Sequence, residues 1–564
     1  MTQFASHKAW RLKAAAILAA AIAASHADVT PFPVFFDAAA PFHQAVALAE
    51  RETRPLEQPI TGVTLPHHLL AGDMIATTLR LASRGDYDRI ILLTPDHFRR
   101  ATAPAVTTTR PFRTVWGDVP VDAVAARAFA GHELVDLSNL FSHEHGVQAI
   151  LPFLAKWFPG VPVLPVALHI RSRQDDWEEL TEALIPLVTP RTLIIQSTDF
   201  SHYLKQPAAA QKDQETLMAL SFGDPAAIPG LDQPEHLDSK AAQWLQMVLQ
   251  KRIHGISTPV IVDNRNAIRY GGRPDEPRTT SYITQLYSPA FIPAAALPGE
   301  SWFFGGDTHF GRHVARAFAD DERAASLRQR ILDVTGGRPL IVNLEGVILD
   351  GPPPGYPHPM QIGMDAALAI PELRKIGVVA VSLANNHTLD YGNDARDRMI
   401  HILEENQIAA LVEGPPRQIG LLRIGVASDL ANHPAPAHNL LTAASFAPWR
   451  AGPPASPLVA FLHAGIEYSD APGDRERQLA AWAEDAGAVL VLGAHPHRPS
   501  PGWERSERAL HFHSLGNLIF DQIDPRNGGG LIEMRFFEQG TWAARWIPLG
   551  NLFKRPPERE KFAP

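Results

Sequence analysis

Cysteine is absent from all 564 residues of the chain. This absence excludes disulfide bridges, thiolate metal ligands and a lipid anchor on an N-terminal cysteine. The folded state must therefore be stabilised by packing alone. Any metal ion must be bound by imidazole and oxygen ligands.

An excess of positive charge is also missing. The chain has 51 Lys and Arg against 60 Asp and Glu, which gives a formal net charge of -9. Domains that bind nucleic acid carry a basic surface, so we expect no nucleic-acid partner. A negative chain also argues against broad capture of polyanions by bulk charge. The hydrophobic fraction of 45% and the charged fraction of 20% are typical of a folded globular protein.

The N-terminal apolar run, Ala14–Ala24, is too short for a membrane span, which needs about 20 residues. Basic residues precede it and small residues follow, which predicts a cleavable secretory signal over residues 1–27, cut after Ala27. Cleavage removes three Lys or Arg and no Asp or Glu, so the mature charge is -9 minus 3, or -12. We expect an exported protein, periplasmic or extracellular, with no stable membrane span. A retained N-terminal anchor is the alternative.

The length of 564 residues exceeds what one hydrophobic core supports, so we expect two or more domains. In the first half, apolar runs at 89–94, 161–168 and 192–197 alternate with helix-like stretches. Such runs predict a parallel sheet covered by helices on both faces. The alternation restarts after a Pro/Ala-rich stretch. We predict an α/β domain over 28–288, a linker over 289–300, a second α/β domain over 301–552 and a disordered tail over 553–564.

Apolar runs in the second half end on Asp, Asn, Glu or His. Ligands of open α/β sheets bind beyond the carboxyl ends of the strands, so these residues predict one shared site. Imidazole and oxygen ligands suit Mn, Fe or Zn, and a carboxylate between two ions about 3.5 to 4 Å apart makes a hydrolytic centre. A single histidine is equally explained as a hydrogen-bonded packing residue. The candidates are Asp307, His309, Asn343, Glu345, Asn386, His387, His463, His495 and His497.

The pair His495 and His497 follows the apolar run 488–494. In an extended strand, residues two apart face the same side, so both side chains are predicted to point into one space. Pro496 between them disfavours a helix at His495. Because the other strand ends supply further ligands, we interpret the pair as one ligand for each of two ions.

The motifs GGDTHFG, VNLEG, SLANNHTLDYG, LHAGIEY, HPH and SLGNLIFD lie in this order between Trp302 and Asp521. Together they resemble the CapA family of poly-γ-glutamate capsule proteins, in the calcineurin-like metallophosphatase superfamily. The resemblance implies a four-layer metallophosphatase-like α/β sandwich that binds two metal ions. It also implies that His387 acts on the leaving-group oxygen.

The same resemblance assigns metal ligands. One ion would be bound by Asp307, His309, Glu345 and His497, and the other by Glu345, Asn386, His463 and His495. Two residues depart from the pattern. Glu345 stands where most metallophosphatases have Asp, and many CapA-like chains lack a histidine at the position of His309. Occupancy by a single metal ion therefore stays open.

Histidine motifs of the first half are LPHHLLAG, LLTPDHF, FSHEHGVQ and STDFSHYL. From Thr61 to Tyr287 the chain resembles the Memo-like family, known in bacteria as AmmeMemoRadiSam system protein B, which shares the fold of LigB-type class III extradiol dioxygenases. The resemblance implies a metal site formed by His67, His97 and a third residue that is often Cys.

Asp238 in HLDSKAAQW corresponds to that third position. Two His and one carboxylate form the triad of non-haem Fe(II) sites, so one Fe or another divalent ion is expected here. His202 corresponds to the acid/base histidine of the dioxygenases, and His145 and Glu144 to pocket or outer-shell residues. Each of these histidines has packing as its alternative role.

Three functions are compatible with these residues. The first is an exported metal-dependent hydrolase that cleaves a phosphoester or an envelope or capsule polymer. The second is an accessory protein of the capsule or exopolymer synthesis machinery that binds polymer without turnover. The third is a metal-dependent oxidative enzyme with its activity in the N-terminal half.

Overall fold

The structure is a computed structural model that describes residues 30–256, 258–273, 275–354, 361–430, 440–451 and 456–553. The predicted signal at 1–27 and all but the first residue of the predicted tail lie outside these ranges. Within them, no helix is long and apolar enough to cross a membrane. Apart from residues 220–222, the chain divides into two compact units between Ile292 and Pro293. Both units are α/β, so the predicted fold class is confirmed.

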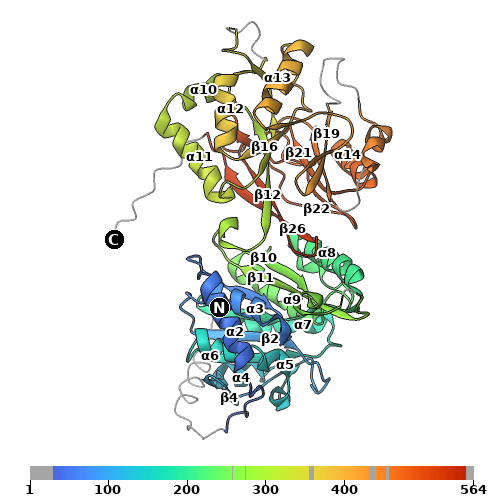
Figure 1. The fold of residues 1–564 in the computed structure, drawn as a ribbon. Coiled ribbons are helices and arrows are strands. Elements are labelled where there is room, and N and C mark those ends of the chain that lie inside the picture. The colour runs from blue at the N-terminus through green and yellow to red at the C-terminus, as the bar shows by residue number, and fades with distance from the viewer. Residues whose placement is uncertain are drawn as a thin grey trace, which may run out of the picture. The chain divides into compact units, whose positions relative to one another are not determined.

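The first unit, blue to green in Figure 1, is built on one mixed sheet with strand order β10-β11-β1-β8-β2-β7-β3-β6, and β9 beside β11. Strands β1, β8, β2 and β7 at its centre are parallel. The strands are β1 (Gly62–Leu65), β2 (Arg89–Pro95), β3 (Ala105–Thr107), β6 (Val135–Leu137), β7 (Val163–Leu168), β8 (Thr192–Ser197), β9 (Phe200–Leu204), β10 (Val260–Asn266) and β11 (Thr279–Tyr287).

The prediction of a parallel sheet is right for the centre of this sheet and wrong for its edges. Strands β9, β10 and β11 pair in antiparallel fashion, and β3 runs antiparallel to β7. The apolar runs that led to the prediction became the buried central strands. Edge strands such as β10, VIVDNRN, mix polar and apolar residues because only part of their surface is buried, so they lack a continuous apolar run.

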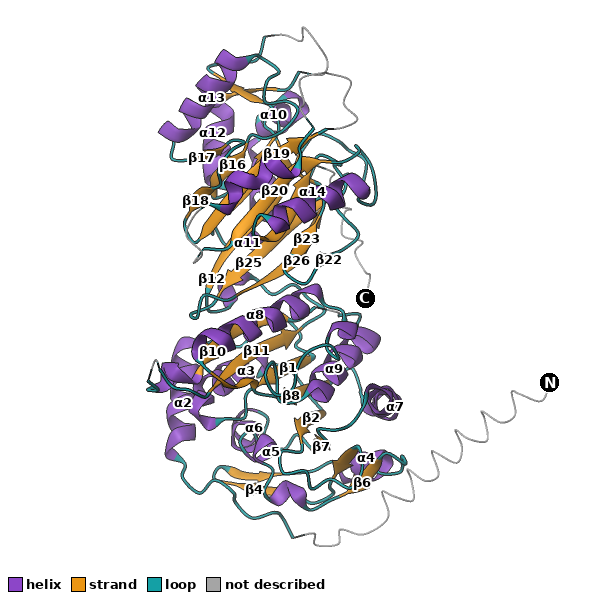
Figure 2. Cartoon of the chain, turned by 90° about the vertical axis from the view of Figure 1, so that its right-hand side faces the viewer, coloured by secondary structure: helices purple, strands orange, loops and turns teal. Residues whose placement is uncertain are grey.

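Helices of the first unit cover both faces of the sheet. One group, α2, α3 and α6, packs together, and α7 packs on α9. Figure 2 shows the central strands between the two groups. The helices are α2 (Ala40–Glu52), α3 (Gly72–Ala82), α4 (Ala123–Phe129), α5 (His145–Gln148), α6 (Leu151–Trp157), α7 (Gln174–Leu184), α8 (Gln206–Phe222) and α9 (Lys240–Leu249), and β4 (Phe112–Thr114) and β5 (Gly117–Val119) form a separate hairpin.

Two larger sheets form the second unit. The first has strand order β17-β16-β13-β12-β25-β26, with β24 beside β12. Its strands are β12 (Glu300–Thr308), β13 (Leu340–Leu344), β16 (Val378–Ser382), β17 (Ala409–Leu411), β24 (Asn517–Ile519), β25 (Gly529–Phe536) and β26 (Trp542–Gly550). The second has strand order β18-β19-β20-β21-β23-β22. Its strands are β18 (Arg417–Ile419), β19 (Leu422–Asp429), β20 (Leu458–Ala464), β21 (Ala488–Ala494), β22 (Glu504–Arg505) and β23 (Leu510–Phe512).

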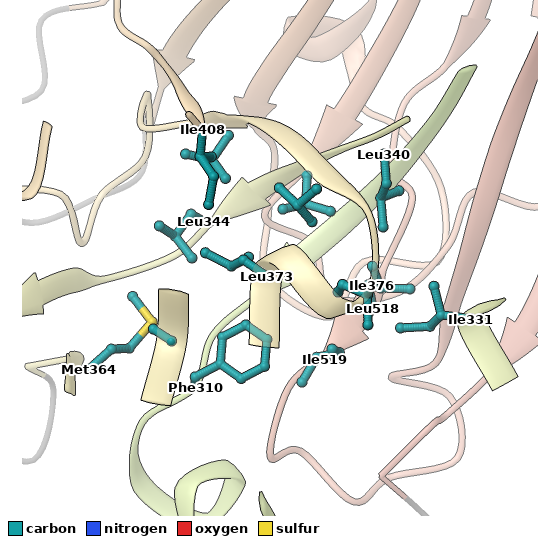
Figure 3. Packing of buried hydrophobic residues seen from close by; sticks show 14 of the residues in the cluster. Phe310, Ile331, Leu340, Leu344, Met364, Leu373, Ile376, Ile408, Leu518 and Ile519 are labelled. Atoms are coloured by element: carbon teal, nitrogen blue, oxygen red, sulfur yellow. The ribbon is translucent and has the colours of Figure 1, made fainter. Parts of the chain in front are cut away.

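Neighbouring residues of β12 show why the second unit has four layers. Side chains alternate along a strand, so Phe303 and Phe304 face opposite sides of the sheet. Phe303 belongs to the buried cluster formed with the helices, part of which is seen in Figure 3. Phe304 lies with its ring centroid 6.4 Å from that of Phe461 in β20 of the second sheet. The helices are α10 (Arg312–Phe318), α11 (Asp321–Thr335), α12 (Ala366–Lys375), α13 (Asn393–Glu405) and α14 (Asp474–Asp485), with a small sheet of β14 (Val347–Leu349) and β15 (Gly363–Asp365).

The outer face of the second sheet is covered by α14 and by the 3-10 helix η8 (Ala443–Arg450), which share a second buried cluster with β20 and β21. The order of layers is therefore helix, sheet, sheet, helix, as the predicted metallophosphatase-like sandwich requires. Most of this buried surface is apolar, and each sheet thus has one face in a helix-covered core.

A buried ion pair lies inside the second unit. Glu533 in β25 accepts hydrogen bonds from Ser301 Oγ at 2.6 Å, from Arg535 Nη2 at 2.8 Å and from Arg545. Both Glu533 and Arg535 are almost completely buried. Burial raises the pKa of Glu533, but the positive charges of Arg545 and Arg535 outweigh it and lower the pKa to about 2.

Replacing Glu533 with glutamine is expected to lower the free energy of unfolding by about 3 kcal/mol at neutral pH, because Arg535 would keep a buried charge without its carboxylate. The depressed pKa contributes stability that is fully present above pH 4.5 and lost as the pH falls toward about 2. The difference between the two proteins should therefore shrink over that window. Equilibrium urea unfolding at several pH values measures it.

The matched control is Glu405→Gln, which removes an exposed carboxylate from α13. Its expected cost is within about 0.5 kcal/mol. A loss for Glu533→Gln no larger than that of the control would contradict a stabilising role of the buried pair.

Candidate metal centres

The predicted ligands of the second unit come from both sheets and meet at the carboxyl ends of their strands. Asp307 lies in β12, Glu345 follows β13, and His463 lies near the end of β20. Carboxyl ends of parallel strands in each sheet point to one edge, which brings residues distant in sequence together. The structure places these three, with Asn386, His495 and His497, in one connected set of contacts.

Asp307, Glu345 and His497 form the most compact group, because one ligand atom from each lies within 4.8 Å of the others. Asp307 Oδ2 lies 3.1 Å from His497 Nδ1, and Glu345 Oε1 lies 3.9 Å from His497 Nε2. All three side chains are buried. Asn343 Nδ2 donates a hydrogen bond of 2.8 Å to Asp307 Oδ1, which fixes the orientation of that carboxylate.

The two buried carboxylates have opposite pKa shifts. Burial opposes ionisation of Asp307, but hydrogen bonds and charge from His497 outweigh it and hold the pKa of Asp307 well below its usual range. Burial and the negative charge of Asp307 raise the pKa of Glu345 to about 8. Glu345 Oε2 is buried without a hydrogen-bond partner. A divalent cation would relieve both the repulsion and the missing contact, so these residues fit a metal ion.

A second group forms around His463. His463 Nε2 lies 2.9 Å from Asn386 Oδ1, and the His463 and His495 rings are 4.8 Å apart. Burial, followed by the nearby charge of His495, holds the pKa of His463 well below its ordinary value. A neutral imidazole is the form that binds metals. The two groups are in contact, because His463 Nδ1 lies 3.9 Å from Asp307 Oδ1.

His309 lies beside the compact group. Its ring centroid is 4.4 Å from that of Phe520, which is itself 4.8 Å from the His497 ring. Both ring nitrogens of His309 are buried without hydrogen-bond partners, and the nearest carboxylate oxygen, of Asp521, is 3.9 Å from Nε2. Burial lowers the pKa of His309 to about 3. The neutral ring can therefore bind a metal ion through either nitrogen, but it lies outside the compact group of Asp307, Glu345 and His497.

His387, predicted to act on the leaving group, has a partner that the sequence reasoning missed. His387 Nδ1 lies 2.8 Å from Asp390 Oδ2, and Nε2 faces Glu345 Oε1 at 3.7 Å. Burial opposes charging of His387, but the hydrogen bond of Asp390 and the charge of Glu345 outweigh it and raise its pKa. Asp390 also accepts from the backbone N–H of Ile362, so its carboxylate is held in place. The spacing of three residues in NHTLD was the available signal for this pair.

The prediction that His495 and His497 lie in an extended strand is wrong. Strand β21 ends at Ala494, and the two histidines have φ values of 100° and 59°. Their ring centroids are 6.3 Å apart. The backbone leaves the strand because the N–H of His495 turns to donate to Asp307 Oδ2 at 3.2 Å. As a result, His495 lies against His463 and His497 against Asp307.

In the first unit, His67 follows β1, His97 follows β2, and Asp238 precedes α9. The two Nε2 atoms are 3.0 Å apart, and Asp238 Oδ2 lies 3.1 Å from that of His67 and 3.5 Å from that of His97. A metal ion about 2.1 Å from each of three ligand atoms separates them by about 3.0 to 3.4 Å. Asp238 Oδ1 is buried without a hydrogen-bond partner. These residues fit a three-ligand metal site.

Contacts behind this triad orient both imidazoles. His67 Nδ1 lies 3.1 Å from Ser197 Oγ, and His97 Nδ1 lies 2.6 Å from Glu144 Oε1. Each contact turns the opposite nitrogen, Nε2, toward Asp238, as outer-shell partners of metal ligands do. Gly146 permits this arrangement, because a Cβ there would lie 2.0 Å from Thr94 Oγ1.

The charges of the triad are strongly perturbed. Burial opposes charging of His97, but Asp238 and Glu144 outweigh it and raise its pKa to about 10. The ring of His145 lies 3.9 Å from that of His97. Burial and the positive charge of His97 lower the pKa of His145 to about 4, so His145 stays neutral beside the site.

His202 is placed apart from the triad. It lies in β9, and among the described residues it makes no hydrogen bond or ion pair with His67, His97 or Asp238. Its Nδ1 is buried without a hydrogen-bond partner. The predicted acid/base histidine thus has an unpaired ring nitrogen and lies near His68. Burial lowers the pKa of His68, and the charge of His202 contributes to the lowering.

Comparisons with known proteins divide the chain at the same place. Residues 45–233 match the family model described as Memo-like protein. A MEMO1 family protein of Thermotoga petrophila is 30% identical over 177 residues, which cover 30% of this chain and 63% of that protein. A MEMO1 family protein of Methanopyrus kandleri is 29% identical over 190 residues, covering 32% of this chain and 66% of the relative.

Residues 301–411 and 432–522 match the model described as Bacterial capsule synthesis protein PGA_cap. The PGA biosynthesis protein CapA of Bacillus subtilis is 38% identical over 93 residues, covering 16% of this chain and 24% of that protein. The aligned parts thus span 66% or less of each of these relatives. The first match contains His67 and His97 and ends before Asp238, and the second contains all the predicted C-terminal ligands. The chain thus joins a segment that matches the Memo-like model to a segment that matches the PGA_cap model.

Proposed function

We propose that this protein is an exported metal-dependent hydrolase whose PGA_cap domain holds a binuclear, phosphoesterase-like centre and acts in capsule or exopolymer metabolism. The observation that carries the proposal is the compact group of Asp307, Glu345 and His497, with two buried carboxylates of opposite pKa shift. A charge arrangement of this kind is costly without a cation and is common at catalytic sites. The similarity to the PGA biosynthesis protein CapA of Bacillus subtilis supports the capsule context.

Two ions of Mn, Fe or Zn would be held by the residues predicted for them. Such ions polarise the scissile group and supply an activated water. Glu345 would be shared by the two ligand sets, with Asp307, His309 and His497 completing one set and Asn386, His463 and His495 the other. The low pKa values of Asp307 and His463 keep both ready as ligands over a wide pH range.

The role of His387 follows from its position and charge. Its raised pKa favours the protonated form, and Nε2 faces the centre while Nδ1 is held by Asp390. A protonated imidazole in this place donates a proton to the leaving-group oxygen as the bond breaks. Asp390 acts through His387 and is a positioning residue.

Replacing Asp390 with asparagine is expected to lower the pKa of His387, because the hydrogen bond and the negative charge that raise it are weakened. Activity that needs protonated His387 is lost as the pH rises through this pKa. The alkaline limb of the kcat profile should therefore move to lower pH by about one unit. Asp365→Asn is the matched control, because Asp365 caps α12 and asparagine caps equally well. An unmoved limb would contradict the assigned pair.

The direct test of the proposal is hydrolysis of a panel of phosphomonoesters and phosphodiesters by the full chain loaded with Mn, Fe or Zn. Asn386→Ala, which removes a ligand from the second group, is the inactive control. Absence of turnover with every metal and ester would reject the phosphoesterase function. It would leave the alternative of an accessory protein that binds polymer without turnover.

A second candidate function belongs to the Memo-like domain. His67, His97 and Asp238 present the two-His, one-carboxylate ligand set of non-haem Fe(II) enzymes, with mutual distances of 3.0 to 3.5 Å. This observation favours one Fe or another divalent ion and leaves oxidative chemistry as an activity of this domain. Oxygen consumption by the iron-loaded chain in the presence of catechols, with His67→Ala as control, tests it.

A further inference from the structure

A cavity of about 510 Å³ opens beside the C-terminal metal centre and has no role in the function proposed above. Its wall is formed by α10 and α11, which pack on each other (Figure 1), and by the segment after β24. The residues that define its chemistry are His313, Arg316, Arg323, Asp521, Ile523 and Phe553.

The charge of the cavity wall is positive. Arg316 and His313 have no hydrogen bond or ion pair with any residue in the described part of the chain. Arg323 donates only a long hydrogen bond of 3.4 Å to the carbonyl of Phe553 and stacks over its ring at 4.7 Å. Asp521 is the one carboxylate among the lining residues that the structure describes, and it already accepts from Arg312 Nη2 at 2.6 Å. Two guanidinium groups are therefore available to an anion.

Asp521 connects this cavity with the metal centre. Its Oδ1 lies 3.9 Å from His309 Nε2, and its partner Arg312 lies over the Phe520 ring at 5.5 Å. The same Phe520 ring is 4.8 Å from His497. A single layer formed by Arg312, Phe520 and Asp521 thus separates the arginines of the cavity from the predicted ligands.

Arg312 combines a strained backbone with a partly unpaired side chain. It has a φ of 48°, an unfavourable conformation for a residue with a side chain, and its Nε is buried without a hydrogen-bond partner. Strained backbone of this kind is frequent at functional sites.

We propose that this cavity is a subsite for a second anionic group, carboxylate or phosphate, of the substrate that is cleaved at the C-terminal centre. Arg316 and Arg323 bind the second oxyanion, and Arg312 lies between it and the reacting group. Guanidinium groups suit this task because they bind carboxylate and phosphate with two parallel hydrogen bonds. The inference rests on the proposed hydrolase function and specifies a substrate with at least two anionic groups. It concerns a local site, and is therefore compatible with the negative net charge of the protein.

The test compares ligands with one and two anionic groups. Dissociation constants are measured by calorimetry on the Mn-loaded full chain for an alkanediol bisphosphate and its monophosphate, and for a short γ-linked glutamate oligomer and glutamate. The double variant Arg316→Gln/Arg323→Gln is compared with Arg398→Gln, which removes an exposed arginine from α13. We expect the double variant to weaken binding of at least one ligand with several anionic groups by about tenfold, or 1.4 kcal/mol. The ligands with one anionic group should bind to both variants alike.

Comparison of the phosphate and glutamate ligands also identifies the type of anion that binds. An effect restricted to the bisphosphate indicates a phosphate-bearing polymer, and one restricted to the glutamate oligomer indicates a polycarboxylate. Equal binding of all four ligands to both variants would overturn the subsite, as would a uniform loss that includes the ligands with one anionic group. Because binding is read directly, absence of turnover with a preserved tenfold effect rejects the hydrolase and keeps the subsite.

Discussion

Replacing Glu345 with glutamine is expected to lower hydrolysis by about 1000-fold and to remove bound metal from the C-terminal domain. An amide keeps the size of the side chain but lacks the negative charge that would lie between two cations. Two-metal centres contribute several kcal/mol to transition-state stabilisation, and each 1.36 kcal/mol corresponds to tenfold in rate. Metal content of the purified variant, measured by mass spectrometry alongside kcat, checks both parts of the expectation.

Single replacements of His495 and His497 are the matched experiment. His495 lies against His463, whereas His497 lies 3.1 Å from Asp307, so their neighbours differ. We expect each alanine variant to lose one metal equivalent and to keep the other. Loss of the same ion in both variants would refute the division into two ligand sets. Full metal content and rate in Glu345→Gln would refute the binuclear centre itself.

Replacing His67 with alanine is expected to weaken metal binding to the Memo-like domain by about 100-fold or more. Loss of an outer-shell partner alone typically costs 10- to 100-fold in metal affinity, and His67 is placed to bind the ion directly. Burial opposes charging of His67, but the carboxylates of Asp199 and Asp238, 3.5 and 3.1 Å from its Nε2, outweigh burial and raise its pKa. Anaerobic titration with Fe(II) on a Glu345→Gln background isolates this site from the other centre.

Two further variants test the metal preference of this site and the specificity of the His67 effect. Asp238→Cys keeps a ligand atom but replaces a hard oxygen by a soft thiolate, so its preference should move from Fe(II) toward softer ions such as Zn. His143→Ala removes an exposed histidine of the same region and should leave the affinity unchanged. Retention of tight Fe(II) binding in His67→Ala would show that His97, His145 and Asp238 suffice without it.

The fold could be predicted where burial alone decides. The run 192–197, TLIIQS, became the fully buried strand β8. Edge strands could not be predicted in the same way, because their polar residues are paired or exposed according to neighbours that lie far away in sequence. Strand β10 is an example, since its register depends on β11.

The candidate sites could be predicted as far as motifs identify residue types. The motif around Asp238 indicates a carboxylate before a helix, and hydrogen bonds between Asp238 and Asp199 hold that carboxylate beside His67 and His97. The partner of His387 was missed, because a carboxylate in a loop carries no pattern until the chain folds. The left-handed backbone of His495 was missed as well, since it depends on a hydrogen bond to Asp307, 188 residues away.

The four-layer sandwich has a consequence for its own cohesion. Among the predicted ligands, Asp307 lies in the first sheet, and Glu345 and Asn386 follow strands of that sheet. His463 lies in the second sheet, and His495 and His497 follow its strand β21. Ions bound among them would link the two sheets, so tighter metal binding would stabilise the packing of the sheets against each other. A ligand present at 1000 times its Kd stabilises a folded protein by about 4 kcal/mol. Chelation should therefore loosen the domain at its middle layers, and the metal supply of the compartment would set how much folded protein persists.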